Sequence, residues 1–498
     1  MFSWMKAVFT LSCIVMFFLS CQSLNPRKPA QEILATTSIE TIPKTFDRLV
    51  DYTPYNYEVL FTDPVCGVYK YTTPTKSVGG KNLTQKPENV FCKNKYDLYR
   101  SGNRTSSPQY RILEWINDVN TKEIFFTYLS FRNKAVKNAL CDASKRGVKI
   151  HFVMSSSEDK TAADELVACS PENVQMKGRG LEGDLGYAHN KFFIVNPNST
   201  SEFKISFSSG NMTSGPVIHH ENWNFITTNP ASHFAQIHKC VMNAEWDDSI
   251  GRNRVTYMKS IQNCRLQITA PEEKDIHAFF IPGEGEKETG AAKKTASDFM
   301  IYGDNGFPGI INAKKIWLGC HRFFYNKMVN EFSKRMLSSN KPELRIVADD
   351  DTYYKANDSE FTSGDTMPAE WVNMKKLRSN GAEVKFLETN SDEHQLHHSK
   401  YLLFADWSGT EPANPVDAFK AVLTGSANLT GAGFKTNWEN IYYITIPEVV
   451  KKFAEHYVHT WNDLATAVED LPLQGNVTSI LIDQPIIKTI EENPKVEK

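Results

Sequence analysis

The sequence has little net charge and few cysteines. Its 498 residues include 56 Lys and Arg and 58 Asp and Glu, which gives a formal net charge of −2. Proteins that attract nucleic acid through their overall field carry a large positive excess, so the composition argues against bulk electrostatic binding of a polyanion. No two cysteines have the Cys-x-x-Cys spacing, which argues against a structural zinc site. We expect neither a metal ion nor another cofactor.

Long apolar runs are also scarce. The run from Ala7 to Leu19 follows a single charged residue, Lys6, and is shorter than the roughly 20 residues that cross a bilayer. This pattern is typical of a secretory signal, so we expect a signal peptide at residues 1–20 and export of the protein. Phe18-Leu19-Ser20-Cys21 resembles a bacterial lipoprotein signal, which predicts lipidation of Cys21 and a place in the cell envelope, in the periplasm or at the outer membrane. Plain secretion and an uncleaved N-terminal anchor are the alternatives.

The cysteines outside the signal region are expected to form disulfides, because an exported protein folds in an oxidising compartment. Connectivity cannot be read from sequence, but similar short spacings favour local pairs. The expected pairs are Cys66–Cys92, Cys141–Cys169 and Cys240–Cys264, with Cys320 left over.

Length and composition indicate a globular protein with more than one core. Hydrophobic residues make up 41% of the chain and charged residues 23%. A chain of 498 residues is too long for a single ordinary core, so two domains or a pair of related halves are expected.

The order strand, helix, strand occurs twice. In the first half, apolar runs at 123–129 and 148–154 flank a helical pattern at 133–145. In the second half, runs at 315–318 and 344–348 flank a helical pattern at 326–337. Strands that alternate with helices predict an α/β fold with helices on both faces of each sheet, here as two fused α/β sandwich modules that form a pseudo-dimer.

The expected boundaries follow from this repeat and from the polar linker near residue 272. After the signal we expect an N-terminal extension at 21–99, module one at 100–265, module two at 275–470 and a C-terminal tail at 471–498.

One motif recurs in both halves. In the first copy, His189-Asn190-Lys191 leads into the apolar run Phe192 to Val195, and Ser208-Ser209-Gly210-Asn211 follows, with Glu221 further on. In the second copy, His398-Ser399-Lys400 leads into Tyr401 to Phe404, and Gly425-Ser426-Ala427-Asn428 follows, with Glu439 further on.

The repeated residues have the chemistry needed to break a phosphodiester. Side chains two positions apart on a strand face the same way, so the histidine and lysine of each copy project together. Cleavage requires an attacking group, an acid for the departing alcohol, and cations or amides on the non-bridging oxygens. Each copy supplies half of this set, so two copies predict one site between the modules.

This doubled pattern resembles the phospholipase D superfamily, whose motif is His-x-Lys, four residues, Asp, and later Gly-Ser-x-Asn. The chain departs from the motif at the aspartate, where it has Asn196 and Ala405, with Asp406 one place late. The first Gly-Ser is replaced by Ser208-Ser209. In the family the aspartate supports the strand through hydrogen bonds, so the resemblance implies that its loss is tolerated.

The resemblance also implies roles for the site residues. One histidine attacks phosphorus to form a phosphohistidine, and the other protonates the leaving alcohol and then activates water. His189 is expected to attack because the family usually uses the N-terminal copy, although the sequence itself does not separate the two roles. The remaining expected roles are phosphoryl binding by Lys191, Lys400, Asn211 and Asn428, added hydrogen bonds from Ser209 and Ser426, and orientation of the imidazoles by Glu221 and Glu439.

The expected function is hydrolysis of phospholipids to phosphatidate and a head-group alcohol, by a monomer associated with a membrane through its lipid anchor. The first alternative is an exported nuclease of the same superfamily, with nucleic acid as the substrate. The second is a degenerate member that binds without catalysis, because both motif aspartates are replaced.

Other polar groups have ordinary interpretations. His397 is expected to pack beside the motif, and His219-His220 and His394 are expected in loops. Asp349-Asp350-Asp351 is expected in a solvated loop, with binding of a cation as the alternative. Gly178-Arg179-Gly180 fits either a turn or a contact with substrate.

Overall fold

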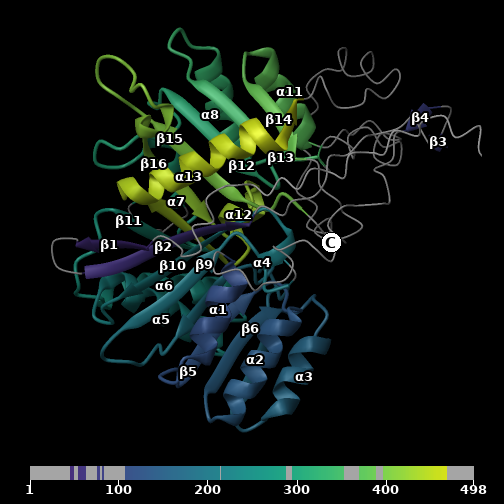
Figure 1. Cartoon of the computed structure of the whole chain (residues 1–498), viewed down its shortest axis with the longest axis vertical. Coiled ribbons are helices and arrows are strands. Elements are labelled where there is room, and N and C mark those ends of the chain that lie inside the picture. The colour runs from purple at the N-terminus through teal and green to yellow at the C-terminus, as the bar shows by residue number, and fades with distance from the viewer. Residues whose placement is uncertain are drawn as a thin grey trace, which may run out of the picture. The chain divides into compact units, whose positions relative to one another are not determined.

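The structure is a computed structural model in which ten stretches of the chain are described (Figure 1). They are residues 45–49, 54–62, 76–78, 81–83, 107–213, 215–287, 294–350, 352, 369–387 and 396–467. All of them belong to one unit of the chain, Pro43–Lys498. The signal peptide, Cys21, the pair Cys66–Cys92, His394, Asp351 and the tail at 471–498 lie outside the described residues.

The first sheet has eight strands in the order β1-β2-β10-β9-β8-β5-β6-β7. The strands β5, β6 and β7 run parallel, and the other pairings are antiparallel. The bounds are β1 Thr45–Leu49, β2 Pro54–Thr62, β5 Glu123–Tyr128, β6 Lys149–Ser155, β7 Val174–Arg179, β8 Phe192–Val195, β9 Phe203–Ser208 and β10 Glu221–Thr228.

The second sheet also has eight strands, in the order β11-β17-β16-β15-β12-β13-β14-β18. Its parallel strands are β12, β13 and β14. The bounds are β11 Ile276–Ile281, β12 Lys315–Cys320, β13 Glu343–Asp349, β14 Glu383–Leu387, β15 Lys400–Ala405, β16 Phe419–Gly425, β17 Glu439–Ile444 and β18 Ala465–Ala467. A separate two-stranded sheet joins β3 (Lys76–Val78) to β4 (Lys81–Leu83).

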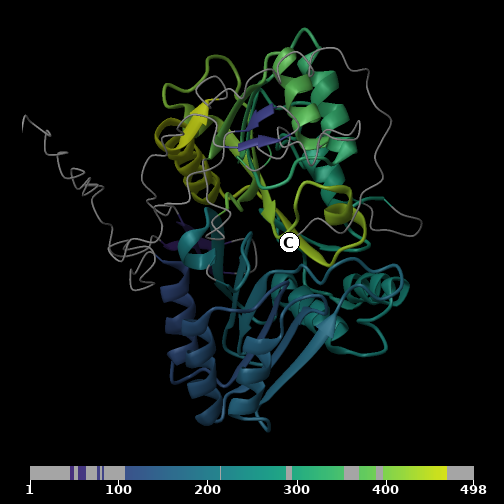
Figure 2. The ribbon, with the colours of Figure 1, turned by 90° about the vertical axis from the view of Figure 1, so that its right-hand side faces the viewer.

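The two large sheets share one topology, which confirms the expected fusion of two α/β modules. From β10 to β7 and from β17 to β14, the strands follow each other in the same order and directions. Strand β2 pairs with β10 as β11 pairs with β17, so residues 54–62 supply the strand that precedes the repeat in module one. The two modules meet along one boundary in Figure 2, where the first is blue to teal and the second green to yellow.

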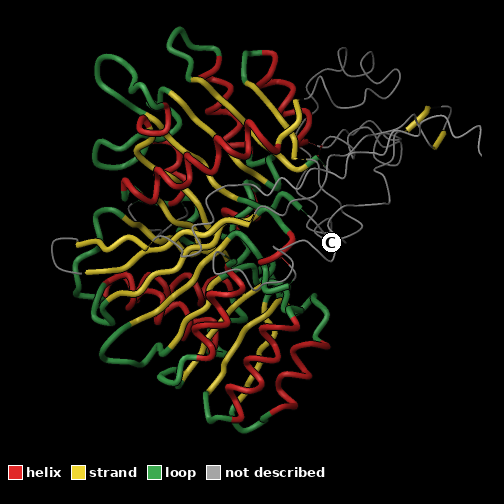
Figure 3. The backbone as a smooth tube through the Cα atoms, viewed as in Figure 1, coloured by secondary structure: helices red, strands yellow, loops and turns green. Residues whose placement is uncertain are grey.

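Helices cover the sheets on both faces (Figure 3). They are α1 Pro108–Asn117, α2 Lys134–Lys145, α3 Thr161–Cys169, α4 Gly215–Ile218, α5 His233–Trp246, α6 Arg254–Gln267, α7 Ala296–Tyr302, α8 Asn326–Met336, α11 Ala369–Ser379, α12 Gly431–Lys435 and α13 Pro447–His459, with short turns η3 Pro415–Ala418 and η4 Thr460–Leu464. Asparagine and serine caps set where helices begin: Asn133 accepts a hydrogen bond from Val136 N at α2, and Ser232 accepts one from Ala235 N at α5.

Side chains along each strand point alternately to the two faces of the sheet, and this divides the core into layers. On β5, Phe126 packs with α1, α2 and α3, whereas Phe125 faces the opposite way, toward α5 and α6. That second core also contains α13 and the facing strands of module two, so one hydrophobic cluster spans both modules. Phe207 of β9 stacks on Tyr442 of β17 with ring centroids 3.7 Å apart. The helices α7, α8 and α11 cover the other face of the second sheet.

Two of the expected disulfides are confirmed. Cys141–Cys169 joins α2 to α3 with 5.7 Å between the Cα atoms, and Cys240–Cys264 joins α5 to α6 with 6.1 Å. Cys320 is buried and free, as expected. Throughout the described part of the chain, each helix is too short or too polar to cross a bilayer.

A buried histidine at the boundary between the modules should make the fold sensitive to acid. His238 donates from Nδ1 to the carbonyl of Phe234 at 2.7 Å, and its Nε2 accepts from the hydroxyl of Tyr442 at 2.8 Å. Burial lowers its pKa to about 3. Because the unfolded chain takes up this proton first, His238 costs stability as the pH falls from about 6.5 toward 3.

We therefore expect the free energy of unfolding of the wild type to fall by about 2–3 kcal/mol more between pH 6.5 and 4 than that of His238→Gln, at about 1.4 kcal/mol per pKa unit. Urea unfolding at several pH values measures both slopes. His459→Gln is the control, because His459 lies exposed on α13. Equal slopes in the wild type and His238→Gln would contradict the prediction.

Candidate active site

The two His-x-Lys motifs precede equivalent central strands. His189 and Lys191 stand immediately before β8, and His398 lies two residues before Lys400, the first residue of β15. The apolar residues behind each motif are buried in their sheet, which fixes the strand. All four motif residues are themselves buried, with His189 1% exposed and His398 6% exposed. Buried polar groups require partners, and each motif finds them in the opposite module.

Backbone hydrogen bonds join the two copies directly. The N–H of His189 donates to the carbonyl of Trp438 at 3.0 Å, and the N–H of His398 donates to the carbonyl of His220 at 2.8 Å. Parallel bridges accompany these bonds, one between Ala188 and Trp438. Each histidine is therefore held by main chain that leads into the acid-bearing strand of the other module.

The two glutamates are each hydrogen-bonded to the histidine of the opposite motif copy. Nδ1 of His189 is hydrogen-bonded to Oε2 of Glu439 at 2.8 Å, and Nδ1 of His398 to Oε1 of Glu221 at 3.1 Å. A carboxylate on Nδ1 fixes the tautomer and ring orientation and leaves Nε2 for chemistry. The structure thus brings the four residues together as two crossed pairs.

Each acid has further partners. Glu439 accepts hydrogen bonds from Ser426 Oγ and, at 3.2 Å, from Asn437 Nδ2. Glu221 accepts one from Trp223 Nε1 at 3.0 Å. Ser209 instead accepts from the backbone N–H of Asn222 at 3.0 Å. Ser426 therefore contacts one of the two acids directly, and Ser209 contacts the backbone next to the other acid.

Burial shifts the proton affinities of these pairs. Loss of water raises the pKa of Glu221 to about 8, against the Trp223 hydrogen bond and the charges of Lys400 and Lys191. Burial likewise raises the pKa of Glu439 to about 7, with Lys191 as the strongest opposing group. The pKa of His398 is held well below its usual value, first by burial and then by Lys400 and neighbouring histidines. Burial therefore favours the neutral forms of Glu221, Glu439 and His398.

The lysines and motif asparagines complete the set. Nζ of Lys191 lies 3.0 Å from both Nδ1 and Nε2 of His189. Nζ of Lys400 donates to the carbonyl of His398 at 3.0 Å and, across the boundary, to that of Ser209 at 3.4 Å. Asn211 and Asn428 follow β9 and β16, and within the described ranges Oδ1 of Asn211 is buried without a hydrogen-bond partner.

Two asparagines that the motif does not include also cross the boundary. Asn440 Oδ1 accepts from the backbone N–H of Lys191 at 2.8 Å, and Asn222 Oδ1 accepts from that of Lys400 at 3.4 Å. Asn222 also donates to Thr424 Oγ1 at 2.9 Å. The sequence marks these two asparagines, because an Asn directly follows the Glu in both copies, at Glu221 and Glu439.

Several histidines gather beside His398. The ring centroid of His321, just after β12, lies 4.8 Å from that of His398, and that of His219 lies 5.9 Å away. His397 and His220 form a second pair, 6.4 Å apart. His219 and His220 lie in the loop between α4 and β10, as expected, and this loop is next to the second motif. Among the residues described, no three His, Cys, Asp or Glu side chains are grouped as ligands for a metal.

The solvated-loop expectation for Asp349 and Asp350 is wrong, because both are fully buried. Asp349 ends β13 and accepts a hydrogen bond from the backbone N–H of His397 at 2.6 Å, next to His398. Arg179 is structural: its fully buried guanidinium donates to the carbonyls of Glu245 at 2.8 Å and Trp246 at 3.0 Å, where α5 ends.

The positions of the missing aspartates are structural. Asn196, at φ +52°, accepts from the N–H groups of Lys122 at 2.8 Å and Glu123 at 3.1 Å and donates to the carbonyl of Asn120 at 3.0 Å. In the second copy, the carbonyl of Ala405 accepts from the N–H of Lys314 at 2.9 Å. Both contacts tie the end of a motif strand to the start of its neighbour.

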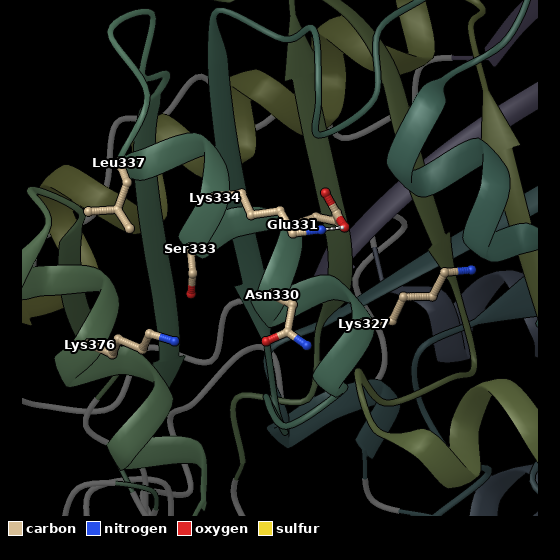
Figure 4. A pocket seen from close by; sticks show the side chains of 7 residues that line it. All are labelled: Lys327, Asn330, Glu331, Ser333, Lys334, Leu337 and Lys376. Atoms are coloured by element: carbon tan, nitrogen blue, oxygen red, sulfur yellow. Dashed lines mark hydrogen bonds and ion pairs between the residues drawn. The ribbon is translucent and has the colours of Figure 1, made fainter. Parts of the chain in front are cut away.

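A shallow pocket on the surface of α8 and α11 is separate from the motif residues (Figure 4). It is lined by Lys327, Asn330, Glu331, Ser333, Lys334, Leu337 and Lys376. Lys334 pairs with Glu331 at 2.6 Å. No residue of the doubled motif contributes to this lining.

Comparison with known protein families gives the family of this chain. The family model described as "Cardiolipin synthase, PLD-like domain" matches residues 112–246 and 310–461, together more than half of the chain. No curated protein sequence matches the chain.

Solved structures with a similar fold include three proteins. Phosphatidylserine synthase of Haemophilus influenzae Rd KW20 has 12% identity and a TM-score of 0.49 over 72% of this chain and 85% of that chain. The yeast tyrosyl-DNA phosphodiesterase has 13% identity and a TM-score of 0.39 over 67% and 86%. Nuc of Salmonella typhimurium, a phospholipase D family member, has 18% identity and a TM-score of 0.26 over 39% and 96%.

Asn196 provides a test of the structural role of the aspartate position. Asn196→Ala removes three hydrogen bonds at a left-handed backbone position, so it should lower the free energy of unfolding by about 1–3 kcal/mol. Asn196→Asp keeps the acceptor and should lie closer to the wild type. Denaturant unfolding measures both, with exposed Asn198→Ala as the control, expected within about 0.5 kcal/mol of the wild type. An Asn196→Ala protein of unchanged stability would contradict this role.

Proposed function

Because the chain belongs to the phospholipase D superfamily, with two copies of its domain, we propose that it is a phosphodiesterase that hydrolyses phospholipids to phosphatidate and a head-group alcohol. The single observation that carries the proposal is the crossed pairing of His189 with Glu439 and of His398 with Glu221. Members of the superfamily act on phosphodiester bonds, and an imidazole in each module that is hydrogen-bonded to a glutamate of the other module supports this chemistry here.

The chemistry follows from these contacts. One imidazole attacks phosphorus through Nε2 and the other gives its proton to the departing alcohol. Lys191, Lys400, Asn211 and Asn428 would hold the non-bridging oxygens, where charge-assisted hydrogen bonds are the stronger kind. Water, activated by the second imidazole, then attacks the phosphohistidine and releases phosphatidate.

Two observations support a lipid as the substrate. The matching family model carries the name of cardiolipin synthase, an enzyme named for a phospholipid. The formal net charge of −2 provides no overall positive field for a nucleic acid.

We also propose that the protein is exported and acts as a monomer at a membrane. The apolar N-terminal run and Cys21 support a lipid anchor. The disulfides Cys141–Cys169 and Cys240–Cys264 are suited to an oxidising compartment.

The experiment is release of choline or ethanolamine from phospholipid vesicles by the purified protein in EDTA. The wild type should release the head group, and His189→Ala or His398→Ala should each reduce the rate at least about 100-fold, because each removes an attacking or proton-transferring group. His459→Ala, exposed on α13, is the matched control and should retain full activity. Circular dichroism verifies that each variant is folded.

Two outcomes would contradict the proposal. Unchanged activity in both site variants would place the chemistry elsewhere. Release of nucleotides from single-stranded DNA without any lipid turnover would assign the nuclease alternative instead.

A further inference from the structure

Lysines and exposed apolar side chains share the outer face of α8 and α11 in module two. The shallow pocket on this face is lined by residues of α8 on one side and by Lys376 of α11 on the other (Figure 4). Along α8, Lys327, Glu331, Lys334 and Leu337 are spaced three or four positions apart, so they form one stripe of the helix. The opposite stripe of α8 is buried in the core of module two.

Two large apolar side chains on this face are exposed. Leu337, directly after α8, is 72% exposed, and Val372 of α11 is 44% exposed. Val372 lies one helical turn before Lys376, so the two side chains project to the same side of α11. The aromatic residues of the two helices, Phe332 and Trp371, are buried. The face therefore presents lysines and aliphatic groups to solvent, while its rings point into the core.

Positive charge is concentrated on these two helices. Together α8 and α11 carry six Lys and Arg and two Glu, a net charge of +4 in a chain whose formal net charge is −2. One of the two acids, Glu370, is buried beside Arg322 at 3.8 Å. Of the three lysines that line the pocket, only Lys334 is in an ion pair with another described residue, its neighbour Glu331.

The equivalent helices of module one lack this combination. Helices α2 and α3 connect β5, β6 and β7 as α8 and α11 connect β12, β13 and β14. They carry three Lys and three Asp and Glu, and Lys137 pairs with Glu165 across the two helices. None of the large apolar side chains exposed in the described chain lies on α2 or α3. The fold itself therefore does not require a basic and apolar face at this position.

We propose that the outer face of α8 and α11 docks on the anionic surface of a phospholipid bilayer, with its lysines at the lipid phosphates and with Leu337 and Val372 in the interface. Charge complementarity supports this partner, since a lysine near an anionic membrane raises affinity about fivefold. Exposed apolar groups rimmed by polar ones are typical of membrane contacts.

A nucleic acid fits this face less well. Single strands are bound by stacking bases on exposed aromatic rings, and Phe332 and Trp371 are turned inward. Aliphatic groups such as Leu337 gain nothing from a hydrated phosphate backbone. The choice of a membrane also rests on the proposed function, although docking itself requires neither catalysis nor the lipid anchor.

Partition of the full-length protein between two vesicle populations in one mixture tests the docking. Dense, sucrose-loaded vesicles contain phosphatidylglycerol, and light vesicles contain only phosphatidylcholine. An N-terminal anchor inserts into both, so its contribution cancels in the ratio. The wild type should favour the anionic vesicles by about 100-fold, at about fivefold for each of Lys327, Lys334 and Lys376. This preference should shrink as salt is added.

Two triple variants with the same change in net charge separate a local face from a general charge effect. Lys327→Gln/Lys334→Gln/Lys376→Gln, the α8–α11 variant, should partition almost evenly. Lys134→Gln/Lys137→Gln/Lys145→Gln on α2 is the matched control and should keep the wild-type preference. Circular dichroism verifies folding. An even partition of the wild type, an unchanged preference in the α8–α11 variant, or an equal loss in both variants would overturn the proposal.

The apolar contribution has its own test. Leu337→Ser/Val372→Ser leaves every charge in place and should reduce the preference for anionic vesicles about tenfold, because these side chains enter the bilayer only when the lysines hold the face against it. A double variant that partitions as the wild type does would contradict insertion. Loss of single-stranded DNA binding in the α8–α11 variant, with its vesicle preference unchanged, would assign the face to nucleic acid instead.

Docking and catalysis fail separately in these experiments. The α8–α11 variant should have a higher KM for anionic vesicles and an unchanged rate on bis(4-nitrophenyl) phosphate, a soluble diester, because its substitutions lie outside the site. A wild type that prefers anionic vesicles but releases no head group refutes the proposed function and leaves the docking face in place. A wild type that hydrolyses vesicles, with an α8–α11 variant that partitions as the wild type does, refutes only the docking.

Discussion

The crossed hydrogen bonds between histidine and glutamate are the constraint on which the rest of the structure depends. Glu439 of module two is 2.8 Å from His189 of module one, and Glu221 of module one is 3.1 Å from His398 of module two. Burying four ionisable groups is costly unless they satisfy one another, so neither module can form its half alone without leaving unpaired groups. The site therefore requires both modules in one fixed relative position.

The remainder of the fold maintains that relative position. Main-chain hydrogen bonds from His189 and His398 to the opposite module hold the first residue of each motif in place. Asn440 and Asn222 accept hydrogen bonds from the backbone N–H groups of the motif lysines, Lys191 and Lys400. Behind them, a hydrophobic cluster shared by both modules, with Phe207 stacked on Tyr442, excludes water from the boundary. Low dielectric strengthens the crossed pairs and raises the cost of breaking them.

Much of this could be predicted from the sequence because the chain repeats. The doubled motif placed Lys191 and Lys400 beside their histidines, and the alternation of strands and helices predicted two α/β modules. Features without a repeat could not be predicted. Strand β2 joins a sheet far along the chain, and Asp349 is buried because a backbone N–H faces the end of β13. His321 and His219 come together only in the folded chain, so no local pattern marks them.

The central claim is that two half-sites make one site. The most direct measurement is a crystal structure with inorganic phosphate, combined with calorimetric stoichiometry. We predict one phosphate per chain, within hydrogen-bond distance of Nε2 of both His189 and His398 and lost in either His→Ala variant. Two phosphates per chain, one on each histidine, or no phosphate at either histidine, would contradict the claim.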